Sequence, residues 1–294
     1  MKIHPWSIEG DMPELDNIPK DENGMRAVHW LSSDTEELFR SNLAYAPKDW
    51  IYRTRVFDYQ INQYNDRCQD PKHITTGDYV LFTGCSFSVG IGLPLEETFP
   101  YLLSQSLGIP YYNLSWPGTG IQVIAHRLMW WLRTFAPPKM IVLQIPELTR
   151  TLIPSYKISD VEPNKDCLEA YSVRDPHYNH RNNQSERRLE ILNDFYNRPD
   201  WMINQFSILS LFCTFLKSFS IPVITGKIVA RPTTNEVFLH EQYFPDIDVK
   251  IPQLIDDARD LGFQAEGLKF RGHLGTKTNQ LLHDLFLERM KSKL

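Results

Sequence analysis

The sequence predicts an α/β fold: a three-layer α/β/α sandwich around a central, mostly parallel sheet of about five strands, with an extension at the N-terminus. Three observations favour this fold. From Asp78 onward, short apolar runs alternate with longer segments of helical period. The apolar runs are continuous, as expected for strands that are buried on both faces. The chain has 294 residues, 42% of them hydrophobic, which is enough for one substantial core.

The predicted strands are short apolar runs that end at turn-forming residues. The first covers residues 79–82 and ends at Thr83-Gly84. Later strands are expected at residues 111–114, 140–145, 221–229 and 262–265. Ligands of such sheets bind outside the carboxyl ends of the strands, so the segments that follow these strands should carry the site.

The predicted helices lie between these strands. In the first, Phe99, Leu102, Leu103 and Leu107 form one apolar face, and Gly108 follows as a helix-ending residue. Further helices are expected at residues 122–135, 201–216, 251–261 and 278–290.

The chain is expected to divide into an extension and a main domain. Residues 1–76 show no long helical or strand period, apart from a short helical pattern at residues 35–39, and should pack on the main domain at residues 77–294. Residues 146–200 are polar and predict a loop-rich insertion.

Composition and charge exclude several classes of function. The formal net charge of −5 supplies no basic surface for a phosphate backbone, so we expect no nucleic-acid partner. No apolar run approaches the ~18 residues of a membrane span, and proline and acidic residues interrupt the start of the chain, so we expect a soluble, cytoplasmic protein.

Metal and disulfide chemistry are not predicted either. The 4 cysteines are scattered and form no Cys/His cluster, which argues against a disulfide framework and a structural zinc. Asp175, His177 and His180 have a spacing that could suit a metal, but a polar loop of this kind is more often solvated surface. We therefore expect no metal and no cofactor.

The segment after the first strand, residues 84–92, allows three interpretations. A phosphate-binding loop needs Lys and then Ser or Thr after its last glycine, whereas Leu93 follows Gly92. A dinucleotide-binding fingerprint needs a third glycine, and here a proline interrupts the pattern. The third interpretation is a nucleophilic serine, Ser86, at the end of the strand, with Gly84 allowing a sharp turn and the Ser86 N–H serving as an oxyanion donor. Cys85 is expected to be a small buried side chain, and a thiol nucleophile is the weaker alternative.

Two further segments can complement Ser86. After the second strand, Gly118 can bring a bare backbone N–H close to an oxyanion, although a plain Pro-Gly turn would look the same. His273 precedes the last helix, from which its imidazole could reach the first segment; the alternative role is to cap that helix.

With these residues, the chain resembles the SGNH, or GDSL-like, family of serine hydrolases, over residues 77–145 and 250–290. The best segment is VLFTGCSFSVGIGLPLEETFPYLLSQSLGIPYYNLSWPGTG, with HLGTKTNQLLHDLF near the C-terminus. The resemblance implies a flavodoxin-like α/β/α sandwich that hydrolyses esters. It places the nucleophile at Ser86, the second-block oxyanion glycine at Gly118 and the catalytic histidine at His273.

The sequence departs from the family pattern at three places. Cys85 stands where the family has the aspartate before its serine. The third block lacks its oxyanion asparagine, so Thr149 or Arg150 would have to donate instead. Phe270 stands where an aspartate should orient the histidine, and the nearest upstream acids are Glu266 and Asp260, of which we expect Glu266 to act.

The first hypothesis is therefore an esterase or deacetylase that cleaves an O-acyl group from a small ester or an acylated glycan, through an acyl-enzyme on Ser86 with His273 as base. An acyltransferase, in which a sugar hydroxyl replaces water, stays open. The alternative is a catalytically impaired module of the same fold that binds a glycan or a protein partner, motivated by the missing acid and asparagine. The oligomeric state is not predicted.

Overall fold

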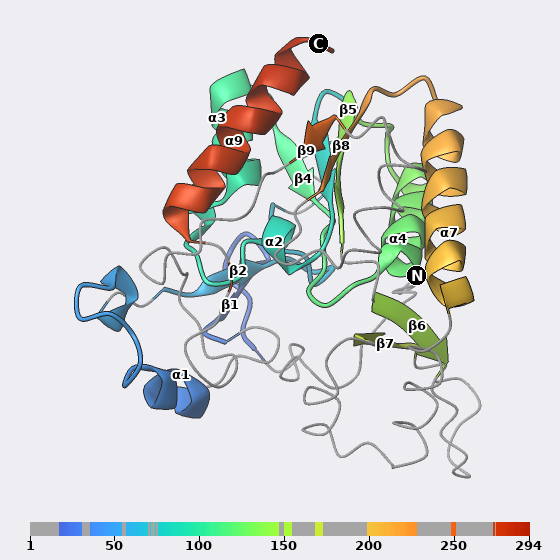
Figure 1. Cartoon of the computed structure of the whole chain (residues 1–294). Helices are drawn as coiled ribbons and strands as arrows, with labels where there is room; N and C mark the ends of the chain where they lie inside the picture. The colour runs from blue at the N-terminus through green and yellow to red at the C-terminus, as the bar shows by residue number, and fades with distance from the viewer. Residues whose placement is uncertain are drawn as a thin grey trace.

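The structure is a computed structural model. It describes residues 18–30, 36–54, 57–69, 71, 74, 76–146, 150–154, 168–172, 199–227, 248–250, 273 and 275–294. Within these ranges the elements form one layered body with smaller hairpins below it (Figure 1).

The centre of the molecule is a five-stranded sheet in the order β4-β3-β5-β8-β9, with every neighbouring pair parallel. Its strands are β3 (Val80–Thr83), β4 (Tyr111–Asn113), β5 (Met140–Ile145), β8 (Val223–Lys227) and β9 (Val249–Lys250). Numbered along the chain, this order is 2-1-3-4-5, the flavodoxin-like order of doubly wound sheets. The predicted fold class, an α/β/α sandwich with a mostly parallel sheet of about five strands, is confirmed for the residues that the structure describes.

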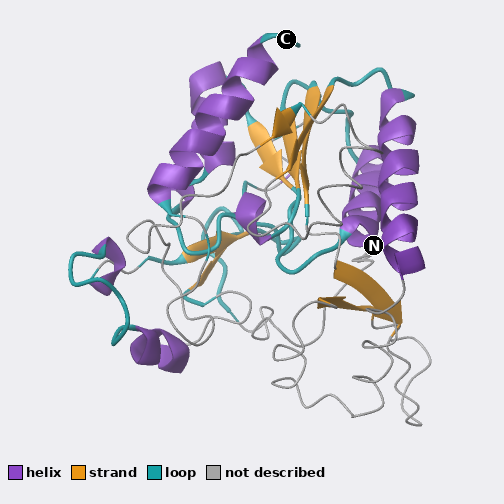
Figure 2. Cartoon of the chain, in the orientation of Figure 1, coloured by secondary structure: helices purple, strands orange, loops and turns teal. Residues whose placement is uncertain are grey.

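Two helical layers cover the sheet. Helices α3 (Phe99–Leu107) and α9 (Thr276–Lys291) lie on one side, and α4 (Ile121–Thr134) and α7 (Pro199–Lys217) lie on the other (Figure 2). β3 connects to β4 through α3, and β4 connects to β5 through α4, on the opposite side. The chain therefore reverses its winding direction at β3, and the crevice at this switch point is where such sheets bind ligands.

The core explains why these segments form a parallel sheet. All residues of β3, β4 and β5 are buried, which is the pattern of strands covered on both faces. Against β8, the Phe286 ring of α9 lies so close to Gly226 that a Cβ at this glycine would be 2.1 Å from Cζ of Phe286. The absence of a side chain at residue 226 therefore lets α9 approach the sheet.

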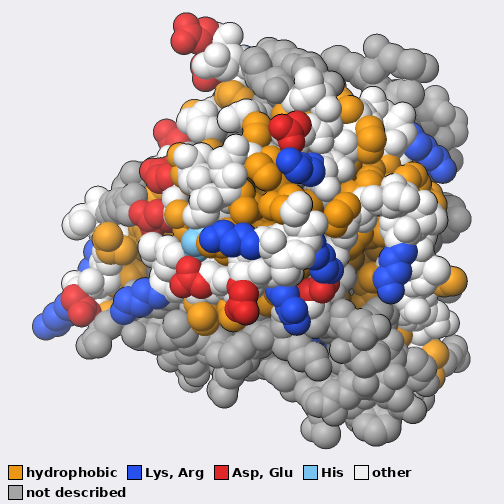
Figure 3. Space-filling view, turned by 90° about the horizontal axis from the view of Figure 1, so that it is seen from above, with side chains coloured by type: hydrophobic (Ala, Val, Ile, Leu, Met, Phe, Trp, Pro, Cys, Tyr) orange, Lys and Arg blue, Asp and Glu red, His pale blue; other side chains and the backbone are white. Residues whose placement is uncertain are grey.

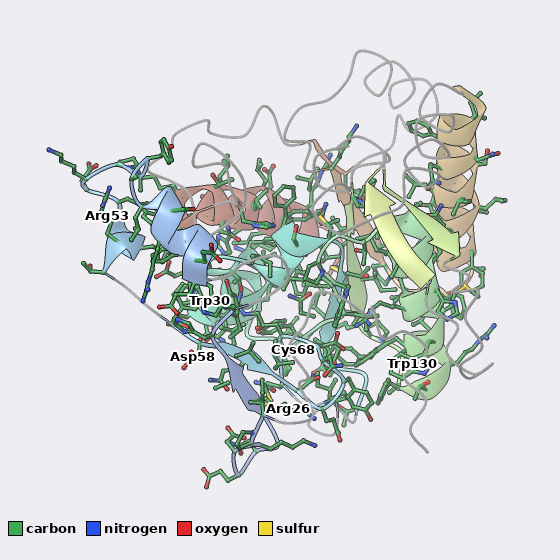
Figure 4. The ribbon with its side chains drawn as sticks, turned by 90° about the horizontal axis from the view of Figure 1, so that it is seen from below. Arg26, Trp30, Arg53, Asp58, Cys68 and Trp130 are labelled. Atoms are coloured by element: carbon green, nitrogen blue, oxygen red, sulfur yellow. The ribbon has the colours of Figure 1, made fainter. Side chains whose placement is uncertain are left out.

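The segment before the sheet contains more regular structure than the sequence predicts. It holds β1 (Arg26–Val28), α1 (Glu36–Asn42), the 3-10 helix η2 (Ile51–Arg53) and β2 (Tyr59–Ile61), and β1 pairs antiparallel with β2. Seen from below, Arg26, Asp58 and Cys68 of this segment lie across the underside of the main body (Figure 4). That underside is the carboxyl edge of the sheet.

Two sequence predictions differ from the structure elsewhere. The described fifth strand is β9, which the sequence analysis did not predict; the strand expected at residues 262–265 and the helix at 251–261 lie outside the described residues. The insertion at 146–200 was predicted to be loop-rich, yet it contains the antiparallel pair β6 (Arg150–Pro154) and β7 (Leu168–Ser172). β9 has 2 residues and β6 and β7 have 5 each, and strands this short with polar residues among them carry too little of an alternating pattern to be recognised from the sequence.

Two features of the described residues bear on the expected partners. Across the described helices, none combines the length and apolar character needed to cross a bilayer. Seen from above, lysine and arginine side chains are spread among acidic ones (Figure 3).

Candidate active site

Ser86 is the first residue of a short helix, α2 (Ser86–Val89), that begins directly after β3 at the carboxyl edge of the sheet (Figure 1). The sequence analysis treated this stretch as a loop. Ser86 is 5% exposed, and extended Cys85 precedes it as the N-cap residue. The first N–H groups of a helix have no acceptor within it, so the Ser86 N–H is oriented outward from the helix start.

Gly84 is required by close packing. A Cβ at this position would lie 2.6 Å from Oε1 of Gln144 and 2.7 Å from Oγ of Ser88. Gln144, fully buried in β5, accepts hydrogen bonds from the Cys85 N–H at 2.8 Å and the Ser88 hydroxyl at 3.3 Å. The turn that presents Ser86 is thus fixed from the neighbouring strand, and Cys85 is buried as predicted.

The segment that carries Gly118 is joined to the same turn. The Trp116 N–H and the Thr119 hydroxyl both donate to the carbonyl oxygen of Gly84, at 3.1 and 3.3 Å. Gly118 has φ +70°, and a Cβ there would meet nothing within 4 Å. Its backbone conformation, rather than crowding, therefore favours glycine.

Asn113, the last residue of β4, connects the two segments from the other side. Its Nδ2 donates to the Ser88 carbonyl oxygen at 2.7 Å, and its Oδ1 accepts from the Ser115 N–H at 3.2 Å. Sequence reasoning missed both Asn113 and Gln144. The feature of the sequence that could have identified them is a single polar residue near the end of an otherwise apolar strand.

His273 lies beside α2. Its ring is 8% exposed and packs edge-on against Phe87, with 5.9 Å between ring centroids and 71° between planes. The structure therefore brings the Ser86, Gly118 and His273 segments to one region of the carboxyl edge. The catalytic roles assigned to these residues stay predictions.

The start of α9, just after His273, is fixed by a hydrogen-bonded cluster. Oε2 of Glu97, the last residue of the 3-10 helix η4 (Leu95–Glu97), accepts from the Thr276 hydroxyl at 2.7 Å and from the Tyr52 hydroxyl at 3.0 Å. In the next turn of α9, Oδ1 of Asn279 accepts from the Phe99 N–H at 3.0 Å. These bonds hold the last helix against the segment that follows α2.

A buried ion pair supports the Gly118 segment. Asp66, 1% exposed, pairs with Arg127 and accepts a hydrogen bond from the Tyr112 hydroxyl at 2.8 Å. The Arg127 guanidinium also donates to the Leu114 carbonyl oxygen at 3.3 Å and lies 5.0 Å from the centre of the Trp116 ring. Burial raises the pKa of the Asp66 carboxyl, and the charge of Arg127 and the Tyr112 hydrogen bond only partly offset this.

The remaining predicted site residues are not positioned in detail. Arg150 begins β6, and its side chain lies outside the described part of the structure. Thr149, Glu266, Asp260 and Phe270 lie outside the described residues, as do His177 and His180. Among the residues that are described, no group of histidine, cysteine and acidic side chains could hold a metal ion.

Comparisons with known proteins give similarities at the level of structure only. No protein-family model and no curated protein matches the chain. The chain is similar to the psychrotrophic esterase EstA from Pseudoalteromonas, with a TM-score of 0.44, 13% identity and coverage of 73% of this chain and 97% of EstA. It is also similar to TesA, with a TM-score of 0.43, 12% identity and coverage of 74% and 99% of the two chains. An acetyl xylan esterase from Butyrivibrio proteoclasticus matches with a TM-score of 0.40 and 11% identity, over 81% of this chain and 68% of the esterase.

Proposed function

We propose that the protein is a serine hydrolase of the SGNH type that cleaves an O-acyl ester, as an esterase or deacetylase acting on a small ester or an acylated carbohydrate. One observation carries the proposal: a buried serine begins a helix at the switch point of the sheet, with a glycine turn and a buried histidine in the adjoining segments. This is the arrangement that nucleophilic acyl transfer needs.

In the proposed mechanism, Oγ of Ser86 attacks the acyl carbon while its proton passes to His273. The negative charge that develops on the carbonyl oxygen is stabilised by the N–H groups of Ser86 and Gly118. The alcohol leaves with the proton from His273, and an acyl group remains on Ser86. Water, deprotonated by His273, then attacks this ester; the bond between the acyl carbon and Oγ breaks, His273 returns the proton to Oγ of Ser86, and the carboxylic acid is released.

Two supporting roles belong to the same proposal. Glu266 orients His273 in place of the missing aspartate, and Thr149 or Arg150 supplies a third oxyanion donor. A neutral imidazole needs a partner on its second nitrogen to hold the correct tautomer, and loss of that partner lowers activity strongly while residual catalysis persists. Glu266→Gln should therefore reduce turnover more than the matched change Asp260→Asn; equal turnover in both variants would contradict the role of Glu266.

The test combines hydrolysis of a short-chain aryl ester with labelling by a fluorophosphonate, read by intact mass. Wild-type protein should turn over the ester and gain one adduct. Ser86→Ala should lose the adduct and lower kcat/KM by about 10³-fold or more, because the nucleophile itself is removed. Cys85→Ala should keep its adduct, which separates the hydroxyl from the neighbouring thiol.

Ser106 provides a matched control. Its Oγ lies 2.8 Å from Nε2 of His283, whose Nδ1 lies 2.8 Å from Oδ1 of Asp284, so it has the hydrogen-bond chain of a catalytic serine. The nearby N–H groups of Gly108 and Ile109 already donate to carbonyl oxygens of the same helix, so these two groups do not serve as oxyanion donors for Ser106. Ser106→Ala should therefore label and hydrolyse like wild type; an adduct on Ser106 in place of Ser86 would overturn the assignment.

The alternative function is a glycan- or protein-binding module without catalysis. It is favoured by Phe270 and by the lack of an asparagine in the third block. In that case wild-type protein would show neither turnover nor an adduct, and Ser86→Ala would bind an acetylated oligosaccharide as tightly as wild type does.

A further inference from the structure

A buried arginine from the N-terminal segment contacts the turn that follows α2, which begins with the proposed nucleophile Ser86 and is here called the nucleophile helix. Arg67 is 3% exposed. Its Nη1 donates to the carbonyl oxygens of Val89 at 3.1 Å and Gly90 at 2.5 Å, and its Nη2 donates to that of Leu93. The guanidinium lies 4.7 Å from the centre of the Tyr59 ring, which covers its other side. The planar guanidinium of Arg67 therefore binds carbonyl oxygens along the whole turn of residues 89–93.

Burying the charged Arg67 guanidinium costs free energy, which indicates that its hydrogen bonds to the turn are needed. Burial lowers the pKa of the Arg67 guanidinium, and within the described part of the chain no carboxylate forms a salt bridge with it. Among the residues that the structure describes, its Nε has no hydrogen-bond partner. A cation that is held in the interior by neutral carbonyl groups, with one donor unused, stabilises less than a paired ion would.

The braced turn leads directly back to Ser86. The Ser86 carbonyl oxygen accepts hydrogen bonds from the N–H groups of Gly90 and Ile91, at 3.1 and 3.3 Å. Gly90 and Gly92 both have positive φ, so the turn is held in a left-handed conformation. The Tyr59 hydroxyl accepts from the Gly92 N–H at 2.8 Å, which gives the turn a second contact from the same segment.

We propose that Arg67 is a positioning residue for Ser86: by holding the 89–93 turn from the N-terminal segment, it sets the orientation of the nucleophile helix. This inference rests on the proposed function. Residues 57–69 are then a fixed support of the active site. They act neither as a movable lid nor as a separate docking segment.

Arg53 offers a matched control within the same chain. Its guanidinium also donates to main-chain carbonyl oxygens, those of Leu43 and Pro47 at 2.8 Å and that of Ala46 at 2.5 Å. These acceptors belong to the outer part of the N-terminal segment. In Figure 4, Arg53 lies at the edge of the molecule, whereas Cys68, the neighbour of Arg67, lies toward its middle.

The experiment compares Arg67→Lys with Arg53→Lys. Each change keeps the positive charge but replaces the planar fork with a single ammonium group, which cannot reach the same set of carbonyl oxygens. We expect Arg67→Lys to lower kcat for the aryl ester and the rate of fluorophosphonate labelling about 10- to 100-fold, with KM nearly unchanged, because only the nucleophile is misplaced. Arg53→Lys should stay within about twofold of wild type. Equal rates in the two variants would overturn the proposal.

A second measurement keeps the inference separate from the proposed function. Hydrogen exchange of the amides at residues 86–93 should be faster in Arg67→Lys than in Arg53→Lys, whether or not the protein is an enzyme. If wild type neither labels nor turns over, the proposed function fails, and equal exchange in the two variants would then also overturn the bracing role.

If Arg67→Lys does not fold, Tyr59→Phe provides a second variant, because it removes only the acceptor for the Gly92 N–H. It should slow labelling as Arg67→Lys is expected to do; an unchanged rate would count against the proposal.

Discussion

Gln144 shows how one buried polar side chain decides the shape of the turn before Ser86. It lies in the otherwise apolar strand β5 and is the acceptor for the Cys85 N–H. A leucine of similar size would fill the space but leave this buried N–H without an acceptor. An unsatisfied buried donor costs about 1–3 kcal/mol.

We therefore expect Gln144→Leu to lower the free energy of unfolding by about 1–3 kcal/mol and to slow fluorophosphonate labelling of Ser86. Denaturant unfolding and the labelling rate measure the two effects separately. Gln105→Leu, on the exposed side of α3, is the control and should change neither. A Gln144→Leu variant that is less stable but labels at the wild-type rate would show that Gln144 supports the fold without orienting the serine.

At this scale the sequence predicts the residues that could react, but not those that hold them. Ser86, Gly118 and His273 follow strands or precede a helix at positions where the chemistry of acyl transfer can be recognised. Gln144 and Arg67 act through hydrogen bonds to main-chain groups distant along the chain, 59 residues away for the Gln144 bond to Cys85 and 22 for the Arg67 bond to Val89. No local period or spacing reports such contacts, because the acceptor and donor groups are common to all residues.

Among the elements, the packing of α9 on β8 depends on the missing side chain of Gly226. A Cβ would lie 2.1 Å from Cζ and 2.7 Å from Cε1 of Phe286, a ring that is fully buried and stacks on Phe99 at 5.4 Å between centroids. Overpacking of a close-packed core typically costs about 1–3 kcal/mol.

Gly226→Ala should lower the free energy of unfolding by about 1–3 kcal/mol. Phe286→Leu, which frees space at the same point, should make the alanine less costly, so the double variant should lose less than the sum of the two single changes. Denaturant midpoints of the four proteins measure this coupling. Strict additivity would mean that α9 shifts as a whole instead of pressing on residue 226.

The elements that the sequence predicted are those with a long or continuous apolar pattern. β5 matches its prediction at residues 140–145, α3 begins at Phe99 and ends before Gly108 as predicted, and α4 differs from its prediction by one residue at each end. α2, β1 and β2 were not predicted because three or four residues carry too little of a period. β9, with two residues, depends on its neighbour β8 rather than on its own sequence.

For the whole molecule, the N-terminal segment is connected to the body by a buried ionic network. Asp66 pairs with Arg127 of α4 and accepts from Tyr112 of β4, so this one carboxylate joins the segment to both elements beside the Gly118 turn. Asn62 extends the network, because its Nδ2 donates to the Tyr112 hydroxyl at 2.9 Å. A change in the charge of Asp66 therefore affects the stability of the whole assembly of segment and sheet.

Because burial raises the pKa of Asp66 in the folded protein, its contribution to stability depends on pH with a definite sign. Below the usual aspartate pKa of about 3.9, the carboxyl is protonated in both the folded and the unfolded chain. As pH rises through the range between that value and the folded pKa, the unfolded chain releases this proton first, so the free energy of unfolding falls. Above the folded pKa the loss is complete.

Asp66→Asn removes this titration and serves as the reference. We expect the free energy of unfolding of wild type, minus that of Asp66→Asn, to decrease as pH rises from 3 toward 7, as measured by urea unfolding at each pH. Groups that titrate alike in both proteins, such as Asp284, whose pKa is lowered by its hydrogen bond from His283, cancel in the difference. A difference that increases with pH would mean that the attraction of Arg127 outweighs the desolvation of the Asp66 carboxylate.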